Sequence, residues 1–143
     1  MKQQSPSRAF HISLWVAQAL LAALFLMAGA TKLLTPMEAL HNMMPWTADT
    51  PEALVRFIGT SELLGGLGLV LPALLRIKPA LTPTAALALA LVQVLATFFH
   101  LSRGENALIG MNLVLFAIAL FIAWGRKNKI PIHAKGYPAS ALQ

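Results

Sequence analysis

Four long apolar stretches separated by short polar segments dominate the pattern along the chain. They cover about residues 12–34, 54–75, 80–101 and 107–124. Each is close to the roughly 20 apolar residues that an α-helix needs to cross the hydrocarbon core of a bilayer. The pattern therefore predicts an all-α protein, a transmembrane four-helix bundle.

The polar segments between the spans predict local structure as well. A short amphipathic piece is expected around residues 36–44. Thr50, Pro51 and Glu52 predict the start of the second span, with Thr50 at the N-cap and Pro51 at the first helical position. The tail after the fourth span contains Pro131, Gly136 and Pro138, and we expect it to be poorly ordered.

Composition excludes a soluble domain. Hydrophobic residues make up 57% of the chain and charged residues only 11%, whereas soluble domains have about 25% charged residues. The mean hydropathy is +0.68. The net charge of +6 comes from basic residues in tails and short loops, not from a basic stripe on a polar face, so nucleic acid is not an expected partner.

The residue types limit the chemistry of the chain. It contains no cysteine, which excludes disulfides and thiolate sites, so in any redox role a bound carrier or a partner must hold the electrons. The four histidines are scattered, with no two at i, i+3 or i, i+4 spacing, and we expect no metal site.

Lysine and arginine in the loops predict the orientation. They are concentrated in the N-terminal tail, in the turn after the second span and in the C-terminal tail, whereas the other side has an acidic segment and a single Arg103. This asymmetry predicts a multi-pass protein of the plasma (inner) membrane with both termini cytoplasmic. The expected organisation is an N-tail (1–11), a membrane domain (12–127) and a C-tail (128–143).

Glu62 is the least expected residue for its position. It lies roughly 12 Å along the helix axis from Leu54, inside the second apolar stretch. A carboxylate at that depth costs a few kcal/mol even on the mildest scale, and such residues usually face other helices. We therefore expect partners for Glu62 on the neighbouring spans.

Other polar residues lie at the same expected depth, in the outer half of each span. Lys32 and His100 fall on stripes of small and polar residues in the first and third spans, which is typical of an interhelical seam. Arg56 is six positions from Glu62 and points elsewhere unless its long side chain curls around. The candidate residues of a ligand pocket are Lys32, Glu62, His100, Asn112 and Arg56.

Each of these residues also has a simpler interpretation. Lys32 and Arg56 can extend to the interface as snorkelling cations, and His100 can be a plain interface residue. Asn112, like Gln18 and Gln93, is typical of a polar contact between helices. The Lys32–Glu62 pair can be purely structural.

Several short motifs resemble those of DoxX-like membrane proteins. They are Ala28-Gly29-Ala30-Thr31-Lys32-Leu33, the segment from Gly59 through Glu62 to Leu69, His100-Leu101-x-Arg103 and the closing Gly125-Arg126. The resemblance covers roughly residues 12–127 and implies a four-helix integral membrane protein. Some relatives are described as subunits associated with quinone-linked oxidoreductases, and many have no assigned activity.

Two functional hypotheses follow. The first is a redox-associated accessory subunit, rather than a stand-alone enzyme, that binds a quinone or another small lipophilic ligand and meets a membrane or periplasmic redox partner. The second is a non-catalytic structural or partner-binding bundle in which the buried ion pair only fixes helix packing. Transport is a third hypothesis, but it requires polar groups in both halves of the bilayer, and the inner halves offer little beyond Thr82, Gln18 and Gln93.

Overall fold

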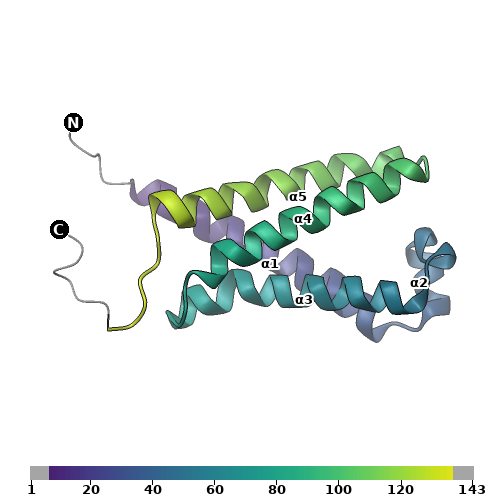
Figure 1. Cartoon of the computed structure of the whole chain (residues 1–143), viewed down its shortest axis with the longest axis horizontal. Coiled ribbons are helices and arrows are strands. Elements are labelled where there is room, and N and C mark those ends of the chain that lie inside the picture. Colours follow the sequence, from purple (N-terminus) through teal and green to yellow (C-terminus); the bar gives the residue numbers. More distant parts are fainter. Residues whose placement is uncertain (1–6, 137–143) are drawn as a thin grey trace.

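The computed structural model describes residues 7–136, and this part of the chain contains helices and no strand (Figure 1). In chain order the elements are α1 (Arg8–Leu34), α2 (Met37–Met43), the 3₁₀ turn η1 (Pro45–Asp49), α3 (Glu52–Leu75), α4 (Leu81–Ser102), α5 (Asn106–Trp124) and the π turn η2 (Gly125–Lys129). Four of these helices, α1, α3, α4 and α5 with η2, are long and apolar enough to cross a membrane. The predicted all-α architecture with four spans is confirmed.

Helix ends follow local capping, with one correction to the prediction. The first helix begins earlier than expected because the hydroxyl of Ser7 accepts a hydrogen bond from the backbone N–H of Phe10. The prediction of Thr50 as an N-cap is wrong. Its hydroxyl instead donates to the carbonyl of Trp46 at 2.8 Å, and α3 begins at Glu52, after Pro51, without a side-chain cap.

The four spans form two hairpins. In the first hairpin α1 packs along α3, and in the second α4 packs along α5. The hairpins meet mainly through α3 and α4, and they diverge toward the end of the bundle where α2 lies (Figure 1). The packed core therefore lies away from α2. It consists of Leu21, Ala22, Phe25, Leu69, Ala86, Leu89, Ala90, Ala119, Ile122 and Ala123.

The outward faces of the spans are apolar. Leu20, Met27, Leu95 and Phe98 are each about two-thirds exposed, and many other large apolar side chains are exposed along all four spans. Such a surface is suited to lipid and not to water. The chain is therefore a membrane protein in a bilayer environment.

Two glycines bring the backbones of α1 and α3 together. A Cβ atom added to Gly29 would lie 2.6 Å from the carbonyl oxygen of Gly59, and one added to Gly59 would lie 2.8 Å from Cβ of Lys32. Small residues permit this close crossing of membrane helices. The crossing fixes the position of the next turn of each helix, which carries Lys32 and Glu62.

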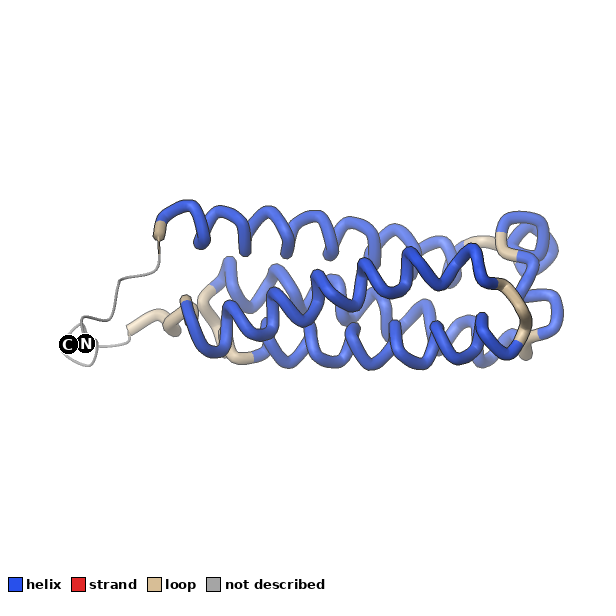
Figure 2. Tube along the Cα trace, turned by 90° about the horizontal axis from the view of Figure 1, so that it is seen from above, coloured by secondary structure: helices blue, strands red, loops and turns tan. Residues whose placement is uncertain are grey.

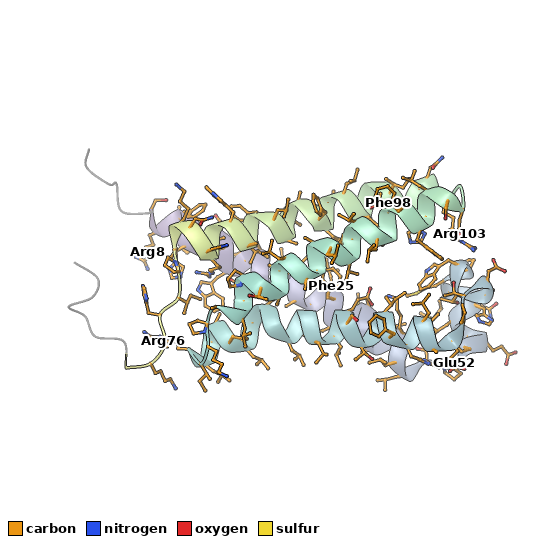
Figure 3. The ribbon with its side chains drawn as sticks, in the orientation of Figure 1. Arg8, Phe25, Glu52, Arg76, Phe98 and Arg103 are labelled. Atoms are coloured by element: carbon orange, nitrogen blue, oxygen red, sulfur yellow. The ribbon has the colours of Figure 1, made fainter. Side chains whose placement is uncertain are left out.

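The two ends of the bundle differ in charge. Arg8 and Arg76 lie at one end, which we call the basic end, and Glu52 and Arg103 lie at the other, the acidic end, together with α2 and η1 (Figure 3). Both ends of the described chain lie at the basic end (Figure 2). This agrees with an even number of spans.

The segment after η2 differs from the expected poorly ordered tail. The backbone N–H of Lys135 donates to the carbonyl of Arg76 at 3.1 Å, and Nε of Arg76 donates to the carbonyl of His133 at 2.9 Å. The segment is therefore hydrogen-bonded to the turn between α3 and α4. Residues 137–143 lie outside the described part of the chain.

Candidate functional site

A cavity of about 420 Å³ lies between the two hairpins, on the side of the acidic end. This volume is within the range of small-molecule sites, about 300–1,000 Å³. Apolar side chains of α1, α3, α4 and α5 form most of its wall, and Trp46 of η1 contributes an aromatic ring. The polar residues that line it are Lys32, Thr50, Ser61, Glu62, Gln93, His100 and Asn112.

Lys32 and Glu62 form a buried ion pair at the wall of this cavity. Nζ of Lys32 lies 2.8 Å from Oε2 of Glu62, and the two residues are only 6% and 7% exposed. The glycine crossing of α1 and α3 explains this contact, because it brings the two helices close one turn before each charged residue. Each charge compensates the desolvation of the other. The structure thus brings together the two residues whose matching depth the sequence predicted.

Arg56 lies outside the cavity. Its Nη1 donates to the carbonyl oxygens of Lys32 and of Thr35, the latter at 2.9 Å, and its Nη2 pairs with Glu52 at 3.0 Å. These carbonyls belong to the last turn of α1, where backbone oxygens lack partners within the helix. Arg56 therefore caps the C-terminal end of α1. Of the five candidate residues, the other four line the cavity.

His100 belongs to a charged network at the acidic end. Its Nδ1 lies 2.6 Å from Oε2 of Glu105, whose other oxygen accepts from Nε of Arg103 at 2.8 Å. Nη2 of Arg103 in turn donates to Asp49 at 3.0 Å. The hydrogen bonds from His100 and then from Arg103 lower the pKa of Glu105 below its ordinary value. The network joins the end of η1 to the turn between α4 and α5, and we call it the acidic-end bridge.

Trp46 packs against the same side of the cavity. Its ring meets Phe99 edge-to-face with centroids 5.8 Å apart, and it meets His100 at 6.3 Å. Tryptophan is enriched at membrane interfaces, and its sequence position between two spans indicates no more than that for Trp46. Its place in the cavity wall could not be predicted, because it depends on how η1 folds back over the ends of the helices.

Two amide atoms in the cavity wall lack partners. Oε1 of Gln93 and Nδ2 of Asn112 are buried, and neither has a hydrogen bond within residues 7–136. These two atoms therefore do not make the interhelical contacts that the simpler interpretation predicted. Leaving a buried polar atom unpaired costs about 1–3 kcal/mol. One acceptor and one donor thus remain unpaired in two side chains that line the cavity.

The motifs that suggested a family now have positions in space, since Gly29, Lys32, Gly59 and Glu62 meet at one helix crossing. The sequence profile of the DoxX-like family matches residues 16–122. The chain belongs to the DoxX-like family. Comparisons with curated proteins and with solved structures gave no significant match. The matched part of this DoxX-like protein, residues 16–122, includes every residue that lines the cavity.

Sequence reasoning missed one buried cation of this DoxX-like protein. Arg126 follows the fourth apolar stretch in the sequence, yet it is only 2% exposed and its Nε donates to Oε1 of Gln18. Gln18 also donates to the carbonyl of Leu69 at 2.7 Å, which confirms its predicted role between helices. The closing Gly125-Arg126 motif was the one available signal. These residues lie at the basic end, away from the cavity.

The cavity of this DoxX-like protein has the chemistry of a site for a lipophilic molecule with a polar head. Its walls are mostly apolar, and its polar groups comprise an unpaired donor, an unpaired acceptor, a buried ion pair and an imidazole. Polar groups of this kind in a mostly apolar cavity are typical of small-molecule sites, where they fix the orientation of a ligand.

Proposed function

We propose that this DoxX-like protein is a redox-associated membrane subunit that binds a quinone-like or other small lipophilic ligand in the cavity between its hairpins. The observation that carries the proposal is the pairing of an apolar cavity of about 420 Å³ with two unpartnered amide atoms, Gln93 Oε1 and Asn112 Nδ2. A void that resulted only from imperfect packing of apolar side chains would have no need of these two hydrogen-bonding groups in its wall.

The polar groups of the cavity fit the two forms of a quinone. A quinone carries carbonyl oxygens, to one of which Nδ2 of Asn112 can donate, and a quinol carries hydroxyls, one of which can donate to Oε1 of Gln93. Reduction of a quinone consumes two electrons and two protons. Glu62 with Lys32, and His100 with Glu105, are the groups positioned to hold the protons. The electrons would come from a redox partner in the membrane or periplasm, so the proposed role is that of an accessory subunit.

A fluorescence titration tests this proposal. Replacing Trp15 and Trp124 with Phe leaves Trp46, in the cavity wall, as the single tryptophan reporter. A short-chain benzoquinone should quench its emission saturably in the reconstituted protein. Asn112→Leu should weaken binding about tenfold through loss of one hydrogen bond, and Glu62→Gln should also weaken it.

Asn42→Leu is the matched control, because Asn42 is an exposed amide on α2 that does not line the cavity. It should bind like the parent. Quenching that never saturates, or that is equal in all four proteins, would show that the quinone only dissolves in the lipid.

The proposed setting is the plasma (inner) membrane with both termini cytoplasmic, which places the cavity on the outer side. The cysteine-free chain permits a direct test with single introduced cysteines at Ala39 and Asn128, both exposed at opposite ends of the bundle. A membrane-impermeant maleimide added to intact cells should label Ala39→Cys only. Labelling of Asn128→Cys alone would reverse the proposed orientation.

A structural role is the second candidate function, and one observation favours it. Lys32 and Glu62 satisfy each other at 2.8 Å beside the closest crossing of α1 and α3, as a pair that fixes helix register would. Under this alternative, benzoquinone binding is absent and the pair matters only for stability.

A further inference from the structure

The basic end of the bundle holds a buried guanidinium that is only partly satisfied. Nε of Arg126 donates to Gln18, and the ring of Trp15 lies 5.0 Å from the guanidinium carbon. Nη1 and Nη2 of Arg126 are buried and have no hydrogen-bond partner in the part of the chain that the structure describes. A buried cation with unused donors is unfavourable unless an acceptor approaches it.

No carboxylate side chain of the chain is placed to pair with this cation. The five acidic residues are Glu38, Asp49, Glu52, Glu62 and Glu105. They lie on α2, η1, the first half of α3 and the turn between α4 and α5, which is the half of the bundle that ends at Glu52 in Figure 3. Among the described residues the ion pairs of these acids involve other cations. The missing acceptor must therefore come from outside the five acids.

A second cavity, of about 360 Å³, lies next to Arg126 at this end. Its lining includes three cations, Lys78, Arg126 and Lys127, and none of the acids. Thr82 also lines it, is 1% exposed, and its hydroxyl has no partner within the described residues. The cavity adjoins the start of α4 at Leu81. The backbone N–H groups of Leu81 and Thr82 already donate to the carbonyls of Lys78 and Pro79, so the donors left for a ligand are side chains.

We propose that this basic-end cavity binds a phosphate-type anion, supplied by the headgroup of an anionic lipid or by free phosphate. The guanidinium of Arg126 offers two parallel N–H donors, a geometry that matches phosphate oxygens, and Thr82 offers a hydroxyl. Lys78 and Lys127 provide the surrounding positive charge. Trp124, at the end of α5, is half-exposed, which is typical of the interface level where lipid phosphates lie.

This site is separate from the proposed quinone site. The two cavities share no lining residue, and they lie toward opposite ends of the bundle. The anion site therefore does not depend on the proposed redox function, and a failure of either proposal leaves the other intact.

The test uses the full chain, delipidated in detergent and then placed in nanodiscs. In one arm, the protein in phosphatidylcholine discs is titrated with inorganic phosphate, with sodium chloride at equal ionic strength as the reference. In the other arm, phosphatidylglycerol is introduced into the discs. The readouts are the thermal unfolding midpoint and, after release from the discs, the number of phospholipids retained in native mass spectra.

A saturable response to phosphate alone identifies free phosphate as the source, and a response to phosphatidylglycerol alone identifies the lipid. A response to both shows that the phosphate group itself is recognised. Each of these results supports the proposal if the response is weaker in the variants Arg126→Gln, Thr82→Val and Lys127→Gln. A lack of saturable response in both arms overturns it.

Site variants localise the response. Arg126→Gln should abolish it, and Thr82→Val and Lys127→Gln should each weaken it about tenfold or less, through loss of one donor or one charge. The two milder variants decide the matter if Arg126→Gln does not fold. Lys135→Gln removes the same charge as Lys127→Gln from a residue that does not line the cavity, and it should bind like the parent. If Lys127→Gln and Lys135→Gln weaken the response equally, the response reflects net charge alone, and the proposed site is overturned.

Discussion

At the scale of single residues, burying the Lys32–Glu62 pair requires the desolvation of two charges, which is unfavourable, and the pair occupies one specific place in the bundle. Two charges have left water for a site that is less than a tenth exposed, and each remains tolerable because the other is 2.8 Å away. Such a pair adds little net stability compared with apolar residues of the same size, so its presence is better explained by position or chemistry than by stability.

Methionine substitutions show how far the stability of the protein depends on the two charges being paired. Lys32→Met or Glu62→Met alone should lower the free energy of unfolding by about 3–5 kcal/mol, because each leaves an uncompensated buried charge. The double variant should recover most of that loss. Denaturant titrations in mixed micelles measure the stabilities. A double variant as unstable as the two single variants combined would contradict this account.

The double variant also distinguishes the two candidate functions. If the cavity binds a quinone through these groups, the folded double variant should lose the saturable quenching of Trp46. If the pair only fixes packing, the variant keeps whatever function the parent has.

The residues that sequence reasoning located correctly share one property. The depth and face of Lys32, Glu62 and His100 follow from their positions on long regular helices, which the 3.6-residue period makes readable. Arg56 and Arg126 could not be located in the same way. Their long side chains reach carbonyls and amides on other helices, and the identity of those partners depends on helix crossings that a single sequence does not specify.

At the scale of elements, the crossing of α1 and α3 holds the site together. Gly29→Ala would place a methyl group 2.6 Å from the carbonyl oxygen of Gly59, and a backbone atom cannot rotate away as a side chain can. We expect a loss of about 1–3 kcal/mol in the free energy of unfolding, or more. Gly110→Ala is the matched control, since a Cβ there meets no atom within 4 Å, and helix propensity should make it neutral or stabilising.

Thermal unfolding in detergent measures both glycine variants. Similar midpoints for Gly29→Ala and Gly110→Ala would show that the crossing can relax without cost.

The number and approximate bounds of the four spans were predictable, because hydropathy and length determine them. The divergence of the two hairpins was not, because it reflects which apolar faces are paired and not how apolar they are.

At the scale of the whole molecule, the acidic-end bridge joins the two hairpins where they diverge. Glu105 contacts His100 and Arg103, and Arg103 donates to Asp49 at the end of η1. The bridge therefore spans the same opening as the cavity, and its strength should influence how far the hairpins separate.

The lowered pKa of Glu105 gives this bridge a defined pH response. A carboxylate with a depressed pKa contributes stability that is fully present above its ordinary value of 4.5 and is lost as the pH falls through the lower folded value. Titration of Glu105 should therefore not weaken the bridge between pH 7 and about 5, and it should weaken the bridge below about 4.5. Spin labels on cysteines introduced at Ala39 and Ala107, which are exposed at the acidic ends of the two hairpins, should report a broader distance distribution in that lower range.

Two substitutions of an acid by its amide make this prediction specific. Glu105→Gln should broaden the distribution already at pH 7 and remove most of the response to acid, because the amide cannot ionise. Glu38→Gln removes an acid at the same end that forms no ion pair within the described residues, so the response should persist. Broadening of the parent that begins near pH 6, or a full further broadening on acidification in Glu105→Gln, would mean that another group controls the separation. The network of Glu105, Arg103 and Asp49 would then be a consequence of the helix arrangement and not a cause of it.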